Sequence, residues 1–353
     1  MKGNVMSLEK KIEEFLLERG AIKVRFANLE SIAGGPPSTD LTYQLEGARS
    51  AVSFALPLDR DRTRRYLAKE EYHEEQVTLS KLSSDLSKHC AQLLANEGYA
   101  SARVHGNNKY RTELPGWQLD MHPDISHRYV AVASGLGTFG WSGNVGIEGY
   151  GTAIILGTVV TTADLTPTDP IPEEESFCDK CKTCVGACVG GMFSKSEEDS
   201  VTLGGKTFTF SRRIDLNRCN LVCGGFTGLH KSGKWSTWSA GRFRVPEKPE
   251  ETLDLLVKSV VQSSKRPAMP SSGGFEPTTL GGKVNIRLTC GICNYICFGD
   301  KDETRENYRL LTSSGCVIQR EDGEKIVLPP EEAAEEFEKM DSVHQALYTD
   351  AGL

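Results

Sequence analysis

The sequence lacks any apolar run near the ~18 residues that a membrane-spanning helix needs. Its longest candidate, residues 152–160, has only the length of a strand. Residues 1–8 lack the charged and apolar regions of a signal peptide, and they contain no twin arginine. An excess of basic residues is also missing, because the formal net charge is −7. We therefore expect a cytoplasmic protein with no membrane contact and no broad surface for nucleic acid.

The sequence does contain enough apolar residues for a sizeable core, since 38% of its 353 residues are hydrophobic and 25% are charged. That balance excludes global disorder. A Pro- and acid-rich stretch at 166–175 predicts a linker. Strands that alternate with helices before this linker favour an α/β layer. Apolar spacing predicts helices over 8–17, 62–97, 123–132, 249–263 and 329–347, and strands over 21–26, 51–56, 100–104 and 152–161.

Eleven cysteines are the strongest chemical signal in the chain. In a reducing compartment such a number is more typical of metal ligands and core thiols than of disulfides. One group runs as C-x2-C-x2-C-x3-C, which is the spacing of bacterial ferredoxins that hold 4Fe–4S clusters. Zinc sites use pairs of ligands at C-x2-C spacing, without a third cysteine so close. The residues of this run are Cys178, Cys181, Cys184 and Cys188.

A second run, Cys290, Cys293 and Cys297, repeats the last three positions of the first run and lacks its first position. The missing ligand must come from elsewhere, and Cys219 and Cys223 are the available donors. In ferredoxins with such runs, three thiolates bind one cluster and the fourth binds the other. The spacing then predicts one cluster on Cys178, Cys181, Cys184 and Cys297, and another on Cys188, Cys290, Cys293 and one of Cys219 or Cys223.

About 170 residues precede the first run, far more than a ferredoxin requires, so we expect this part to receive the electrons. Four motifs stand out: Tyr72-His73 with Leu79 and Leu82, the segment GLGTFGWSGN at 135–144, the segment from Gly149-Tyr150-Gly151 to Ala163-Asp164-Leu165, and Asn217-Arg218-Cys219. Together with the cysteine order, they resemble the cobalamin-dependent epoxyqueuosine reductases and the reductive dehalogenases built on the same core. The resemblance covers roughly residues 8–300.

The resemblance implies an α+β protein with two domains and a tail. A nitroreductase-like α/β domain over residues 1–170 would bind base-off cobalamin. A ferredoxin-like domain over residues 171–310 would hold both 4Fe–4S clusters and carry a long insert at about 190–288. An acidic helical tail would follow over residues 311–353. A low-potential ferredoxin or flavodoxin is the implied electron donor.

The resemblance also implies particular cofactor contacts. The family's arginine–cysteine context favours Cys219 over Cys223 as the eighth cluster ligand. A corrin is a broad, flat ring, and glycine lets a backbone approach such a ligand closely. Taken alone, the glycines have an alternative role as a helix cap and a turn. The expected cobalamin contacts are Tyr72, His73, Gly135, Gly137, Gly140, Ser142, Gly143, Asn144, Gly149, Tyr150 and Gly151.

The expected reduction also consumes a proton. In the epoxyqueuosine reductases an acid just before the glycine helix supplies it, and Asp120 resembles that residue at a spacing about one residue longer. Asp124 and Tyr129 are the competing candidates. Burial beside a cofactor would favour the neutral acid, which suits a proton donor. The alternative for Asp120 is a carboxylate in a loop or a cap.

The sequence leaves the substrate open. The lysine of the family's GKN segment is missing, the tail is short and acidic, and the insert between the cysteine runs is long. We therefore expect tRNA to bind weakly or not at all. The queuosine precursor or another small epoxide, halide or unsaturated compound would be reduced. Two alternatives are a dicluster electron carrier without cobalamin and a protein that passes electrons to the cobalt of another protein.

Overall fold

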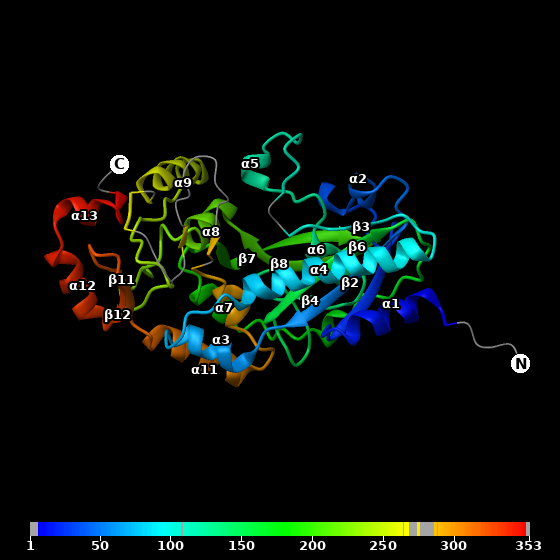
Figure 1. Ribbon diagram of the computed structural model, residues 1–353, viewed down its shortest axis with the longest axis horizontal. Coiled ribbons are helices and arrows are strands. Elements are labelled where there is room, and N and C mark those ends of the chain that lie inside the picture. Colours follow the sequence, from blue (N-terminus) through cyan, green and yellow to red (C-terminus); the bar gives the residue numbers. More distant parts are fainter. Residues whose placement is uncertain are drawn as a thin grey trace, which may run out of the picture.

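The structure, a computed structural model, describes residues 6–106, 109–263, 265–267, 274–275, 286–287 and 289–350. Its first half is built on an antiparallel sheet in the strand order β1-β2-β6-β3 (Figure 1). Part of the insert predicted at about 190–288 lies outside the described residues. The strands are β1 (Lys23–Asn28), β2 (Ser50–Pro57), β3 (Ser101–Arg103) and β6 (Ile154–Thr161).

The chain segment that joins β2 to β3 crosses over β6, which lies between these two strands. Both strands pair antiparallel with β6, so they run parallel to each other with β6 inserted between them. The two helices that join them, α3 (Arg60–Leu67) and α4 (Glu75–Asn96), therefore form a crossover of the split βαβ type. The sequence predicts one helix over 62–97. The chain breaks it between α3 and α4, where Lys69 adopts a left-handed φ of +57°.

Helices cover both faces of this sheet, and β2 shows how the faces differ. Its large side chains, such as Phe54, join the core beneath α1 (Leu8–Leu17) and α4. Its alanines, such as Ala51, face α6 (His127–Ala133). Phe54 fits because Gly157 on β6 has no side chain, and a Cβ there would overlap the Phe54 ring. The small residues let α6 approach the sheet closely, which positions the start of α6 beside the site described below.

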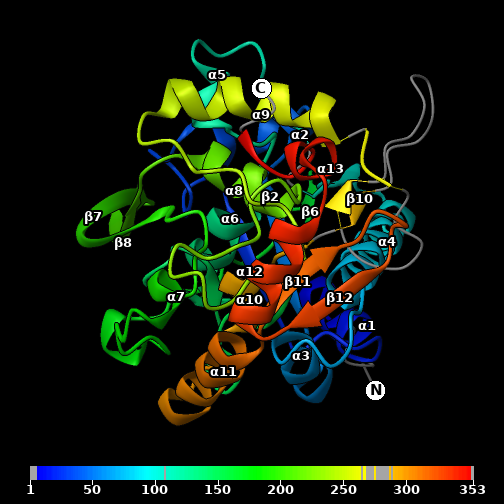
Figure 2. The same cartoon turned by 90° about the vertical axis from the view of Figure 1, so that its left-hand side faces the viewer.

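The second half carries the cysteine runs on short elements. The hairpin of β7 (Phe193–Leu203) and β8 (Lys206–Arg213) projects from one side of the molecule in Figure 2. The longer elements that follow are α8 (Leu216–Cys223), α9 (Pro249–Ser263), α11 (Lys301–Ser313), β11 (Cys316–Gln319), β12 (Lys325–Leu328), α12 (Pro330–Lys339) and α13 (Ser342–Ala346). The tail predicted as one helix over 329–347 is thus two helices, preceded by a hairpin.

The remaining elements are short. They are α2 (Leu41–Gln44), α5 (Trp117–Asp120), β4 (Thr138–Phe139), β5 (Val145–Gly146), α7 (Thr183–Gly186), β9 (Gly274–Phe275), β10 (Ile286–Arg287) and α10 (Ile292–Tyr295), with 3-10 turns at Pro37–Thr39 and Glu173–Glu175. The second of these turns lies in the predicted linker. Apart from that turn, residues 166–175 adopt no regular structure, as the linker prediction expects.

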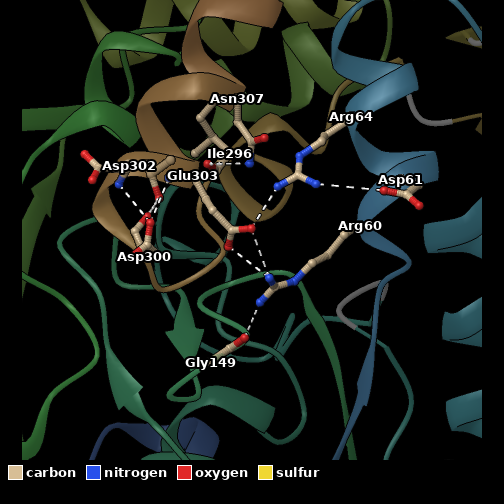
Figure 3. Close-up of polar contacts among 10 residues, drawn as sticks. Arg60, Asp61, Arg64, Gly149, Ile296, Asp300, Asp302, Glu303 and Asn307 are labelled. Carbon is tan, nitrogen blue, oxygen red and sulfur yellow. Dashed lines mark hydrogen bonds and ion pairs between the residues drawn. The ribbon is translucent and has the colours of Figure 1, made fainter.

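Ion pairs tie the first half of the chain to α11, the helix that follows the last cysteine of the second run. Glu303 binds both Arg60 and Arg64 of α3 at 2.9 Å, and Arg60 also donates to the Gly149 carbonyl (Figure 3). The three side chains are between 31% and 40% exposed, so solvent screens each pair and its separate contribution is small. Their combined effect is to hold α3, α11 and the turn at 149–151 in one arrangement.

The described residues confirm a protein of mixed helices and strands. They contain no helix that is both long and apolar enough to cross a membrane. The finer predictions stay predictions: a nitroreductase-like domain over 1–170, a ferredoxin-like domain over 171–310 and a helical tail over 311–353.

Candidate metal centre and adjoining cleft

Four of the predicted cluster ligands surround one cavity of about 200 Å³. They are Cys178, Cys181, Cys184 and Cys297, and the cavity also touches Cys293. The loop between the first three turns sharply, because its two lysines at 180 and 182 adopt left-handed φ values of +56° and +60°. Cys297 arrives from the second run. The two runs, far apart in sequence, therefore meet at this cavity.

Backbone N–H groups point at the thiols. The amide of Trp141 donates to Cys178 Sγ at 3.3 Å. The amide of Met192 donates to Cys188 Sγ at 3.4 Å. Hydrogen bonds to cluster sulfurs are one of the factors that set a reduction potential, so the chain supplies such donors to a ligand of each predicted cluster.

The remaining predicted ligands form a second group. Burial raises the pKa of the Cys188 and Cys293 thiols to about 12, and both thiols lie near Cys219 and Cys290. Cys223 lies against this group as well, with its Sγ 3.6 Å from that of Cys219. Cys219 and Cys223 are four residues apart on one face of α8. Cys219 neighbours all three of the other predicted ligands, and Cys223 hydrogen-bonds both Cys219 and Cys290.

The thiols of neither group converge on a point. Among the described residues, no three side chains of His, Cys, Asp or Glu are close enough to hold one metal ion. A 4Fe–4S cluster is a different case, because its four thiolates bind four irons and stand around a larger body.

The glycines predicted to contact a corrin pack against the chain itself. A Cβ on Gly135 would overlap the carbonyl of Asp169, and a Cβ on Gly137 would overlap the carbonyl of Gly146. Among these predicted glycines, Gly149 is the one with open space at that position. The close approach that the others allow is to the protein's own atoms. For Gly140, Gly143 and Gly151, protein atoms lie 3.0 Å or less from the Cβ position.

The predicted pair Tyr72 and His73 lies in an aromatic cluster behind the second run. The Tyr66 hydroxyl, at the centre of that cluster, donates to the carbonyl of Cys290 at 3.1 Å. The cluster therefore supports the loop that carries Cys290. Its members are Tyr66, Tyr72, His73, Trp238 and Tyr295.

A separate cleft of about 300 Å³ opens beside the second cysteine group. Asn144 and Asn294 form part of its polar wall, and the amide of Asn144 donates to Asn294 Oδ1 at 2.9 Å. The Asn144 side chain also hydrogen-bonds the Cys293 thiol. The apolar wall consists of Val145, Ile154, Ile155 and Leu156. An apolar wall with a few polar groups is typical of a small-ligand site. Of the predicted cobalamin contacts, Asn144 alone lines this cleft.

Two arginines that sequence reasoning missed meet beside this cleft, and one of them lines it. Arg128 lines it and donates to the Gly143 carbonyl at 2.6 Å. Arg213 donates to the neighbouring Ser142 carbonyl at 3.1 Å. Burial and the adjacent charge of Arg213 lower the pKa of Arg128 to about 9. No carboxylate is among the charges that shift either pKa. In sequence nothing distinguishes Arg213 from its neighbour Arg212, and only the fold brings it to Arg128.

The predicted proton donors lie at different depths. Asp120 ends α5 and is exposed, so the burial expected to keep this acid neutral is missing. Its segment nevertheless packs on the helix of Cys219, where Asn217 donates to the Gln118 carbonyl at 3.1 Å. Asp124 is half-buried. Tyr129 is half-buried beside the Arg128 guanidinium, which lies 5.5 Å from its ring centre. A catalytic role for any of the three stays a prediction.

No protein-family profile and no curated protein matches the sequence. Among solved structures, an epoxyqueuosine reductase bound to an epoxyqueuosine-modified stem loop of tRNA-Tyr is 18% identical, with a TM-score of 0.37 over 52% of this chain and 52% of that chain. The Streptococcus thermophilus epoxyqueuosine reductase is 16% identical, with a TM-score of 0.37 over 57% and 56% of the two chains. The catabolic reductive dehalogenase NpRdhA with 3-bromo-4-hydroxybenzoic acid is 14% identical, with a TM-score of 0.45 over 63% and 30%.

The chain therefore spans about half the length of the epoxyqueuosine reductases that it matches. Its structural neighbours are epoxyqueuosine reductases and a B12-dependent reductive dehalogenase, the two groups that its sequence motifs resemble.

Proposed function

We propose that the protein is an iron–sulfur oxidoreductase, in which two 4Fe–4S clusters deliver electrons to a small organic substrate in the cleft beside the second cluster. The observation that carries the proposal is the meeting of two distant cysteine runs around one cavity. Interlocked runs are what two clusters require, since the last cysteine of each run serves the other cluster. Bound clusters supply one-electron transfer at low potential.

The cysteines fit this proposal in number and in grouping. Cys219 is preferred to Cys223 as the eighth ligand because it neighbours each of the other three ligands in its group. The thiols bind iron as thiolates, so the metal charge must overcome burial, which raises the thiol pKa at five of the eight ligands: Cys178, Cys184, Cys188, Cys293 and Cys297. The first set is Cys178, Cys181, Cys184 and Cys297, and the second is Cys188, Cys219, Cys290 and Cys293.

The exposure of one cluster ligand indicates where electrons enter the protein. Cys181 is exposed, so an external donor can reach the first cluster, and we propose a ferredoxin or flavodoxin for that role. Cys293 belongs to the second cluster and also borders the cavity of the first. The next residue, Asn294, lines the cleft. The short helix α10 thus borders the first cluster, the second cluster and the cleft.

Cobalamin is the finer part of the sequence prediction, and the cleft beside the second cluster does not fit it. At every predicted glycine except Gly149, other protein atoms lie within 3.0 Å of the position that a Cβ would take. The cleft beside the second cluster, at about 300 Å³, lies at the small end of the range for small-ligand pockets. We therefore derive no step through a corrinoid, and its binding stays a prediction for experiment.

Within the cleft, the chain itself can orient a substrate and exclude water. The Asn144 and Asn294 amides are fixed by their mutual hydrogen bond and can hold a polar group. The apolar wall of β6 keeps water from the body of the ligand. Tyr129, Asp120 and Asp124 remain the candidate proton donors. We propose a small epoxide, halide or unsaturated compound as substrate, because the net charge of −7 opposes tRNA binding.

Single-turnover reoxidation tests the proposal. Anaerobic protein reduced with titanium(III) citrate would be mixed with styrene oxide, 3-bromo-4-hydroxybenzoate, an unsaturated acid or an epoxyqueuosine-modified tRNA stem loop. We expect a small compound to restore the oxidised visible spectrum and to yield a reduced product. A stem loop that alone reoxidises the protein would contradict the assignment of a small substrate.

The second candidate function is a dicluster electron carrier, and the poor fit of the corrin-contact residues favours it over a cobalamin enzyme. Reduced protein that passes electrons to cytochrome c but to none of the trial substrates would support the carrier. Parallel samples with added cobalamin distinguish the electron carrier from a cobalamin enzyme. A shifted corrin spectrum would show that the cofactor binds.

A further inference from the structure

Arg128 carries the one formal charge among the described residues that line the cleft, since they include no Asp or Glu. The cleft's histidine, His127, is engaged at both ring nitrogens. Nδ1 lies 2.8 Å from the Thr158 hydroxyl, and Nε2 lies 3.0 Å from the His105 carbonyl. Burial also lowers the His127 pKa. The described lining of the cleft is therefore cationic at neutral pH.

Arg213 stands beside Arg128, and the two guanidinium charges repel each other. Arg213 also lies near the thiols of Cys219 and Cys293. Thiolates at the proposed second cluster would give Arg213 a negative counter-charge. Arg128 lies beside Arg213 and the Tyr129 ring, and no carboxylate is among the charges that act on it. Among the described residues, the buried guanidinium at the cleft wall thus has no carboxylate partner.

We propose that the substrate carries an oxyanion, either a carboxylate or a phosphate, which binds Arg128 in the cleft. This inference rests on the proposed function and names the substrate class of the same site. The hydrogen bond to the Gly143 carbonyl fixes the Arg128 side chain and leaves its other N–H groups for a ligand. A guanidinium presents its donors in a planar fork that matches such oxyanions. The apolar wall of β6 then holds the body of the molecule.

Calorimetry of the anaerobic protein with loaded clusters tests this directly. The probes are benzoate, phenyl phosphate and the neutral benzamide. We expect both anions to bind at millimolar concentration or below and benzamide to bind at least about tenfold more weakly. The tighter of the two anions identifies a carboxylate or a phosphate as the natural group. Absence of anion binding at millimolar concentration would overturn the inference, as would equal affinity for benzoate and benzamide.

Three variants locate the binding. Arg128→Gln should weaken benzoate binding at least about tenfold, and Arg128→Lys should restore part of it, because the charge returns without the fork. Arg212→Gln is the matched control: it removes the same charge from an exposed arginine that pairs with Glu197 at 3.2 Å. Equal affinity in the Arg128→Gln protein and the wild type would overturn the assignment.

Binding is measured without turnover, and iron is measured on the same samples. A protein that holds both clusters but does not distinguish benzoate from benzamide therefore contradicts this inference alone. A protein that cannot hold clusters contradicts the proposed function instead.

Discussion

The backbone of Gly151 lies against the backbone of Gly299. A Cβ on Gly299 would stand 2.8 Å from the Gly151 nitrogen, and a Cβ on Gly151 would overlap the Gly299 nitrogen. The next residue, Thr152, extends the contact: its amide donates to the Cys297 carbonyl at 3.0 Å, and its hydroxyl donates to the Cys293 carbonyl at 3.1 Å. The strand β6 is thus joined at its start to the loop that carries the second cysteine run.

Gly151→Ala should therefore destabilise the folded protein more than Gly149→Ala. Both glycines have a positive φ, +55° and +76°, so alanine carries a similar backbone strain at each. Only at Gly151 does the added methyl meet backbone atoms, whereas the space at Gly149 is open. We expect Gly151→Ala to lower the free energy of unfolding by about 2 kcal/mol more than Gly149→Ala. Urea unfolding under anaerobic conditions measures this difference, and equal losses would contradict the packing argument.

Cys219→Ser should lose one of the two clusters, whereas Cys223→Ser should keep both. The reason is that Cys219 lies near each of the other ligands of its group, Cys188, Cys290 and Cys293. Iron and sulfide analysis of the reconstituted variants measures the outcome. Cys90→Ser is the control, because that thiol is buried within the core of the first half. Loss of iron in Cys223→Ser alone would reverse the assignment.

Lys69 makes stability depend on pH. Burial lowers its pKa from the ordinary 10.5 to about 7. Between these values the unfolded chain binds a proton that the folded chain does not, so the folded state is penalised. The penalty is absent above pH 10.5, grows as the pH falls, and is complete below about pH 7.

Lys69→Met removes this penalty. Its stability advantage over the wild type should shrink by about 1.4 kcal/mol per unit as the pH rises from 7 toward 9. Urea unfolding of both proteins across this range provides the measurement, because other titrating groups cancel in the difference. An advantage that stays constant with pH would show that Lys69 is charged in the folded protein.

Local patterns predicted the elements whose stabilising contacts are close in sequence. The helices α1 and α9 have the predicted bounds, because their apolar spacing and end signals are continuous. The break between α3 and α4 was not predicted, since the apolar pattern continues through it and the left-handed Lys69 has no sequence signal. The β7–β8 hairpin was also missed. Its Gly204-Gly205 turn is a hairpin signal, but the polar run before it hides the strand.

In the candidate site, too, some features could be predicted from sequence and others depend on the fold. Cysteine spacing is a local property, so both runs could be recognised in the sequence, and the fold brings them to one cavity. Their division between two clusters stays a prediction. A glycine in the sequence does not show what its backbone will contact, because it permits close approach of a ligand or of the protein itself. At the predicted glycines other than Gly149, the atoms that approach closely belong to the protein. Arg128 and Arg213 could not be found from sequence, since their proximity depends on how the fold brings both side chains to the carbonyls of residues 142 and 143.

Anaerobic iron and sulfide analysis combined with Mössbauer spectroscopy measures directly whether this chain holds two 4Fe–4S clusters. We expect about eight irons and about eight sulfides per chain in fully reconstituted protein, all in 4Fe–4S clusters. About four irons or fewer, or zinc in place of iron, would contradict this expectation.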